Sequence, residues 1–162
     1  MENKVTAFAA IVEKVFRVGG WAPLMVFGIH VILSRVFNAY VVFPPTDIPM
    51  HFFGGLAMAF FISRCFQALP REVVRSSRIV ALELILVGSL TTSAAVIWEF
   101  TEFACDQIFG SNIQRGLGNT MRDMGLGIAG ALVIMVLRAH ALKAKPAELR
   151  SVATEWMAGR AA

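Results

Sequence analysis

Acidic side chains recur at helical spacing in the segment that runs from Trp98 to Asp123. Glu99, Glu102 and Asp106 are separated by three and then four residues, so on a helix they project from one face. Further polar residues follow, next to an apolar run: Gln114, Arg115, Asn119, Arg122 and Asp123. Polar groups at the depth of a membrane are costly and commonly mark a site. The segment is therefore the first candidate for function.

Carboxylates and one imidazole supply a predicted set of metal ligands: Asp47, His51, Glu99, Glu102 and Asp123. Such ligands suit Mg²⁺, Mn²⁺, Zn²⁺ or Ca²⁺, and no thiolate favours a softer ion. A bound divalent cation could polarise a phosphoryl oxygen or activate a water molecule. His51 and Glu99 are the catalytic candidates, but no spacing among them is diagnostic of a reaction.

A second set of side chains is predicted to contact a ligand: Asp106, Gln114, Arg115, Asn119 and Arg122. A lipid-linked or otherwise phosphorylated headgroup is the natural ligand class, because Arg115 or Arg122 could bind its oxygens.

The composition favours a membrane protein. The 162 residues, enough for one domain, are 57% hydrophobic and only 16% charged, with a mean hydropathy of +0.66. A soluble protein has about 25% charged residues. The formal charge of +4 comes from basic residues in short clusters between apolar runs, which is a signal of membrane topology. Nucleic-acid binding is not expected.

The apolar runs predict an all-α integral membrane bundle of four transmembrane helices, at about residues 21–37, 47–66, 79–103 and 119–141. Residues 1–18 form an amphipathic helix that either lies in the membrane interface or packs on the bundle. The transmembrane domain spans residues 19–141. Residues 142–162 are a cytoplasmic tail, either a short amphipathic helix or a disordered end. Pro44 and Pro45 are expected to force an extended approach to the second span.

Lysine and arginine are distributed unevenly between the two faces of this bundle. Twelve lie in the N-terminal segment, the second loop and the C-terminal end, against Arg35, Arg115 and Arg122 on the other face. The asymmetry predicts a protein of the inner (cytoplasmic) membrane with both termini in the cytoplasm. The outward ends of the second, third and fourth spans then bring together the predicted ligands. Five carboxylates against three arginines leave two negative charges, which require protons, a bound cation or a cationic ligand.

Two alternatives remain open. The polar residues could be a structural clasp of ion pairs, in which Asp47 caps the second span and Glu102 or Asp106 pairs with Arg115 or Arg122. The protein could instead be a small carrier, which would need a homo-oligomer because four short helices enclose little space. A carrier needs polar groups that continue inward, and only His30 and Glu83 are candidates. Glu83 is expected to reach the cytoplasm or to pair with an arginine of the second loop.

Three motifs resemble those of the YjdF-type family of small bacterial inner-membrane proteins. They are D-x-x-x-H-F at Asp47, W-E-x-x-E-x-x-x-D at Trp98, and Q-x-G-x-x-N/D-T-x-x-D at Gln114. Asn119 stands where we expect an aspartate in many relatives. The resemblance covers about residues 43–131 and extends, more distantly, to VanZ-like proteins. It implies an integral membrane protein, and the VanZ-like relatives imply a link to the cell envelope by analogy.

Overall fold

The computed structural model describes residues 2–68 and 77–143, with side chains from residue 9 to 68 and from 81 to 141. These residues are helical, with no strand among them, which confirms the predicted all-α class. The elements are α1 (Glu2–Val15), a π-helical turn η1 (Phe16–Gly20), α2 (Trp21–Arg35), α3 (Ala39–Val42), a 3-10 turn η2 (Pro44–Thr46), α4 (Asp47–Gln67), α6 (Ser77–Phe109) and α7 (Leu117–Lys143). The predicted tail and most of the second loop lie outside the described residues.

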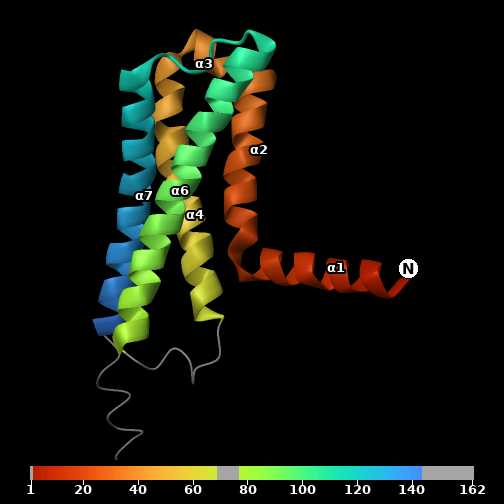
Figure 1. The fold of residues 1–162 in the computed structure, drawn as a ribbon, viewed down its shortest axis with the longest axis vertical. Helices are drawn as coiled ribbons and strands as arrows, with labels where there is room; N and C mark the ends of the chain where they lie inside the picture. Colours follow the sequence, from red (N-terminus) through yellow and green to blue (C-terminus); the bar gives the residue numbers. More distant parts are fainter. Residues whose placement is uncertain (1, 69–76, 144–162) are drawn as a thin grey trace, which may run out of the picture.

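Four segments of the described chain are long and apolar enough to cross a membrane: Ala9–Arg35, Pro44–Gln67, Ala81–Phe109 and Leu117–Ala141. Helices α2, α4, α6 and α7 stand side by side (Figure 1). Helices α2 and α6 run toward α3, whereas α4 and α7 run away from it. The end of the bundle that carries α3 is called the α3 end below. The predicted four-helix membrane bundle is confirmed.

Helix α1 turns sharply away from the bundle at the π-helical turn (Figure 1). Gly19 adopts φ 145° at this kink, a backbone conformation that favours glycine. A β-carbon at Gly19 would also lie 3.2 Å from the Phe60 ring. The predicted N-terminal helix is present, and apolar side chains such as Ile11 and Val12 are exposed on it. Its position in a membrane interface remains a prediction.

Small residues on α4 and α7 allow these two helices to pack closely together. A β-carbon added to Gly55 would lie 2.6 Å from Cα of Gly127, so only hydrogen fits there. One turn further along, Ala59 and Ala131 are buried at 0% and 2% exposure. Small residues at four-residue spacing let two membrane helices approach closely. Because α4 and α7 run in the same direction, the two stripes stay in register.

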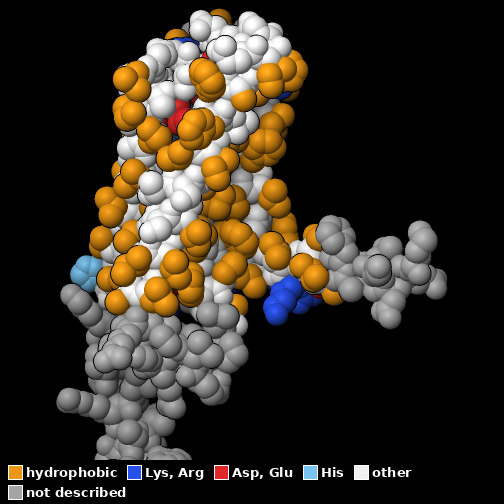
Figure 2. All heavy atoms as spheres, in the orientation of Figure 1, with side chains coloured by type: hydrophobic (Ala, Val, Ile, Leu, Met, Phe, Trp, Pro, Cys, Tyr) orange, Lys and Arg blue, Asp and Glu red, His pale blue; other side chains and the backbone are white. Residues whose placement is uncertain are grey.

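Apolar side chains are spread along the face of the bundle that Figure 2 shows. Large residues on several helices are more than half exposed, such as Leu24, Ile85, Ile97 and Leu137. Exposure of this extent would be unfavourable in water and is the pattern expected of helices that face lipid. The core is correspondingly small and centres on Ala59, Val87 and Ala131.

Helix boundaries differ from the predicted ones in two places. Helix α6 continues to Phe109, six residues beyond the predicted end, and stops before Gly110, which has φ 64°. Glycine in this left-handed conformation commonly ends a helix. Pro44 and Pro45 begin a 3-10 turn instead of an extended segment, because their fixed φ also suits the first turn of a helix.

A satisfied buried ion pair lies at the end of the bundle opposite α3. Glu83 is 1% exposed, and Arg138 binds both of its oxygens, at 2.7 and 3.1 Å. Ser63 donates to the same carboxylate at 3.0 Å, and Gln67 donates to Ser63. The partner of Glu83 among the described residues thus comes from α7, whereas the side chains of Arg71, Arg75 and Arg78 in the second loop lie outside them.

Candidate functional site

Three helix ends supply the polar residues at the α3 end. Asp47 and His51 lie in the first turns of α4, Glu99 and Glu102 lie near the end of α6, and Asp123 lies in the second turn of α7. His51 precedes Gly55 by one turn, and Asp123 precedes Gly127 by one turn. The close glycine contact therefore also sets the distance between the imidazole and the Asp123 carboxylate.

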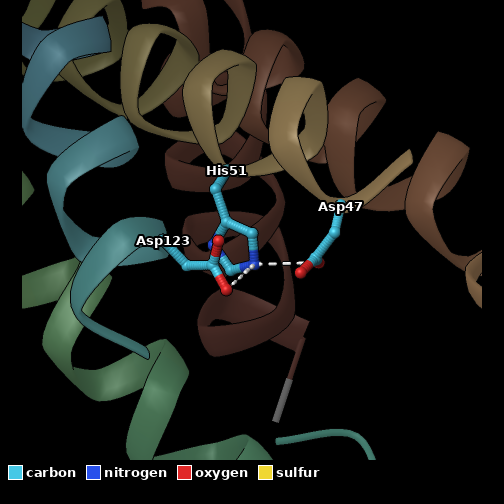
Figure 3. Close-up of side chains that lie close together, drawn as sticks. All are labelled: Asp47, His51 and Asp123. Carbon is cyan, nitrogen blue, oxygen red and sulfur yellow. Dashed lines mark ion pairs between the residues drawn. The ribbon is translucent and has the colours of Figure 1, made fainter. Parts of the chain in front are cut away.

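His51 is the centre of the arrangement. Its Nε2 atom lies 3.2 Å from Oδ1 of Asp47 and 3.9 Å from Oδ2 of Asp123, so the ring stands between the two aspartates (Figure 3). The other ring nitrogen, Nδ1, lies 3.8 Å from Oε1 of Glu99. The imidazole thus faces carboxylates on both sides, one set on α4 and α7 and the other on α6.

The carboxylates of Asp47 and Asp123 are already compensated by α7 residues. Arg122 lies 3.2 Å from Asp47 and 3.0 Å from Asp123, and it also donates to the Asn119 side-chain oxygen. The Asn119 amide donates to Asp47 at 3.4 Å and to Asp123. We call Asp47, Asn119, Arg122 and Asp123 the clasp. Arg122 joins α7 to α4 across the bundle, as the structural alternative expects of a clasp.

The carboxylates of Glu99 and Glu102 lack such compensation. Glu99 is 4% exposed, and neither of its oxygens has a hydrogen-bond partner among the described residues. Glu102 is 8% exposed and accepts one hydrogen bond, from the Trp98 indole at 2.9 Å. We call these two glutamates the acid pair. The Thr120 hydroxyl is a further buried polar atom without a partner.

Two groups of side chains could hold a metal ion, and His51 belongs to both. One consists of Asp47, His51 and Asp123, and the other of His51, Glu99 and Glu102. Within each group, one ligand atom per residue lies within 4.8 Å of the others. The five predicted metal ligands are thus gathered at one place, but they divide into two sets on opposite sides of the imidazole.

Three predicted ligand-binding residues make no hydrogen bond to the acid pair: Asp106 lies in the last turn of α6, and Gln114 and Arg115 lie in the loop between α6 and α7. Asp106 accepts hydrogen bonds from Ser111 and from the backbone N–H groups of Ile113 and Gln114, so it orders this loop. Arg115 donates to the Tyr40 carbonyl oxygen at 2.5 Å. The clasp alternative proposed that Glu102 or Asp106 pairs with Arg115 or Arg122. No such ion pair is found among the described residues.

Aromatic residues beside the acid pair form a group that the sequence did not predict. Nδ1 of His30 lies 2.6 Å from the Tyr40 hydroxyl, and the His30 and Trp98 rings meet edge to face at 5.2 Å. Burial raises the pKa of Tyr40 to about 12, and the charges of Asp47 and Glu102 act in the same direction. The one available signal was that Tyr40 is the only tyrosine in the chain.

The inward polar groups that a carrier would need are both engaged. His30 is bonded to Tyr40, and Glu83 is held by Arg138 at the other end of the bundle. These contacts give no support to a continuous polar pathway through the described residues.

Comparisons with known proteins agree with the membrane architecture. No curated protein and no solved structure matches the chain. A family model described as a predicted membrane protein, DUF2238, covers residues 6–144, and the resemblance to YjdF-type proteins is consistent with this family. The chain therefore belongs to the DUF2238 family of predicted membrane proteins.

Proposed function

We propose that this membrane protein binds one divalent cation between His51 and the acid pair, Glu99 and Glu102. The observation that supports the proposal most directly is the environment of Glu99. Its carboxylate is buried at 4% exposure, and both oxygens lack a partner. An ionised carboxylate without compensation costs several kcal/mol in such surroundings, so the group calls for a proton or a cation.

The same bundle contains a carboxylate that shows how burial is otherwise satisfied. Glu83 is equally buried, and Arg138 and Ser63 together bind both of its oxygens. Among the described residues no arginine or lysine pairs with Glu99, which instead shares a possible metal site with His51 and a second glutamate. A divalent cation would compensate both glutamates, and His51 supplies a neutral nitrogen ligand.

The clasp is the less suitable place for the cation. Arg122 and Asn119 already supply positive charge and N–H donors to Asp47 and Asp123. A metal ion there would have to compete with the guanidinium. We therefore assign Asp47 and Asp123 to the positioning of His51, and the acid pair to the cation. Two carboxylates and one imidazole suit Mg²⁺, Mn²⁺, Zn²⁺ or Ca²⁺.

The ligand that we propose for the bound cation is the phosphorylated headgroup of a cell-envelope lipid. The side chain of Arg122 is 44% exposed at the rim of the site, where its free donors could bind phosphate oxygens. Gln114 and Arg115 border the same end of the bundle. The distant resemblance to VanZ-like proteins supports an envelope role by analogy.

We place the α3 end outside the cytoplasmic membrane, with both termini in the cytoplasm. Among the described side chains, Lys14, Arg17, Arg64 and Arg138 lie at the opposite end, and the sequence adds further basic residues there. Positive residues concentrate on the cytoplasmic side of bacterial membrane proteins. A reporter enzyme that works only in the cytoplasm should be active when it is fused to the C-terminus, whereas one that works only outside the cytoplasm should be inactive.

Elemental analysis of the detergent-purified protein tests the cation site. We expect one equivalent of a divalent metal in the parent protein and none in Glu99→Gln or Glu102→Gln, which keep the side-chain volume but remove the charge. Asp106→Asn is the matched control, because Asp106 is an acidic residue of the same helix that only orders the loop. It should keep the metal.

The clasp variant Asp47→Asn separates the two ligand sets. If the cation binds to the acid pair, Asp47→Asn retains it, although His51 loses a partner at 3.2 Å. Loss of metal from Asp47→Asn with retention in Glu99→Gln would place the cation in the clasp. Metal-free parent protein that still folds and cannot be loaded would rule the cation out.

A purely structural role is the second candidate function, and the clasp favours it. Arg122 ties α7 to α4, and Asp106 fixes the loop, without any ligand. On this alternative Glu99 is simply protonated, and Glu99→Gln is as stable and as functional as the parent protein. Activity of the Glu99→Gln variant in a cell-envelope complementation assay therefore distinguishes the two.

A further inference from the structure

A partly open cavity of about 500 Å³ lies among the helices of the bundle and reaches polar residues at the α3 end. Its wall comes from α2, α4, α6 and α7, and it is mainly apolar, with Leu24, Phe27, Met58 and Phe61 among its residues. Its polar lining includes His51 and Asp123 at one end. The cavity therefore has a long apolar part and a charged end.

The depth of the cavity follows from the residues that line α4. His51 and Phe61 are ten positions apart on this helix, which corresponds to about 15 Å at 1.5 Å per residue. This length lies within a segment apolar enough to span a membrane. An occupant must accordingly be apolar along most of its length and polar only where it meets His51.

Two features of the cavity wall bear on what the space can hold. A β-carbon at Gly54, which lines the cavity, would meet no atom within 4 Å. The Thr91 hydroxyl, also in the wall, is buried without a partner. Apolar cavities of this size hold little water, whereas they bind apolar ligands.

We propose that the cavity binds one apolar chain of an amphiphile whose phosphorylated headgroup lies beside His51, next to the proposed cation. The inference rests on the proposed cation site, because the clustered carboxylates would otherwise repel a phosphate. Continuity of the apolar space with the charged residues is what selects an amphiphile. A wholly apolar molecule would leave His51 and Asp123 facing hydrocarbon.

The test measures the quenching of the fluorescence of Trp98, which lies in the cavity wall. Trp21→Phe and Trp156→Phe leave Trp98 as the single tryptophan of three. The protein is reconstituted in lipid nanodiscs, and decyl phosphate brominated at its terminal carbon is added as the probe, with the divalent cation that elemental analysis identifies. Binding gives saturable quenching, whereas partition into the bilayer gives quenching that rises linearly.

Gly54→Leu fills the cavity, and Gly28→Leu is the matched control. Both glycines are helical and would meet no atom within 4 Å, but Gly28 is not part of the cavity wall. We expect saturable quenching in the parent and in Gly28→Leu, and binding at least about tenfold weaker in Gly54→Leu. The bound metal should be unchanged in all three, which separates a filled cavity from a lost cation site.

Other outcomes overturn the inference. Linear quenching in all variants, or saturation that Gly54→Leu leaves unchanged, means that the cavity does not bind the chain. Equal affinity for brominated decanol means that the headgroup has no part in binding. Saturable quenching that Gly54→Leu weakens but that persists in metal-free protein supports the binding of the apolar chain in the cavity. It overturns the proposed cation site.

Discussion

His51 on α4 and Asp123 on α7 lie 3.9 Å apart because each stands one helical turn before a glycine at which the two helices touch. The contact with Gly127 leaves no room for a β-carbon at Gly55, so the backbones of α4 and α7 approach closely here. The register of two small-residue stripes thus controls the geometry of the polar site. Substitutions at the glycine contact should affect both stability and site.

Gly55→Ala should destabilise the bundle. The new methyl group would overlap the Gly127 backbone, and forced overpacking costs about 1–3 kcal/mol. Gly54→Ala is the neighbouring control, since its methyl group meets no atom and alanine favours a helix. Thermal unfolding in detergent measures both. Equal stability of the two variants would show that α4 and α7 do not make this contact.

Arg122→Gln should lower stability, and a divalent cation at the acid pair should raise the stability of the parent protein and of this variant by a similar amount. Asp123 is fully buried, and removing one partner of a buried ion pair costs about 3–5 kcal/mol. We expect the lower part of this range, because Arg122 is 44% exposed. A cation at about a hundred times its Kd would add about 2.7 kcal/mol if it binds only the folded protein.

Arg115→Gln is the control for this experiment, because Arg115 contacts only the Tyr40 carbonyl oxygen among the described residues. Its melting temperature should stay near that of the parent protein with or without metal. If added metal stabilises Arg122→Gln clearly more than the parent and Arg115→Gln, the cation binds at the clasp in place of the guanidinium and not at the acid pair.

Tyr40 should ionise with a midpoint near pH 12, and its unfolded value is about 10. Burial and the charges of Asp47 and Glu102 disfavour the phenolate in the folded protein. The unfolded chain therefore loses this proton first, so the stability that the neutral phenol provides is complete below about pH 10 and is lost between about pH 10 and 12. Tyrosinate absorbance reports on this residue alone, as the chain has one tyrosine.

The Asp47→Asn variant checks the cause of the shift. Removing this charge should move the Tyr40 midpoint downward, although burial keeps it above 10. A Tyr40 midpoint of 10 in the folded parent protein would mean that the hydroxyl is not buried beside His30. Tryptophan fluorescence, recorded in parallel, shows whether the protein is still folded at each pH.

The sequence was sufficient to predict four spans and the gathering of their polar ends. Apolar runs of membrane length determine where helices cross, and helices that alternate in direction bring Asp47, Glu99 and Asp123 to the same end. These features depend on the position of residues along the chain. Periodicity and hydropathy report such positions directly.

The division of the site into a clasp and an acid pair could not be predicted in this way. It depends on which side of α7 faces α4 and on the rotamer of Arg122, neither of which a single sequence specifies. The same limitation applies to Glu83, whose partner depends on the rotation of α7 relative to α6. Tyr40 was missed because its segment was interpreted as a plain connection, whereas it forms the short helix α3.

The ion pair of Glu83 and Arg138 is the reference for Glu99, because it shows how much stability depends on a buried glutamate that has a counter-charge. Glu83→Gln leaves Arg138 partly buried without its counter-charge, which should cost about 3–5 kcal/mol in unfolding experiments. The double variant Glu83→Gln with Arg138→Met should recover much of this loss, because no unpaired charge remains. Glu99→Gln, by contrast, should cost little in metal-free protein, since no cationic side chain pairs with Glu99 except His51 at 3.8 Å. A large loss of stability in metal-free Glu99→Gln would show that Glu99, like Glu83, serves the fold.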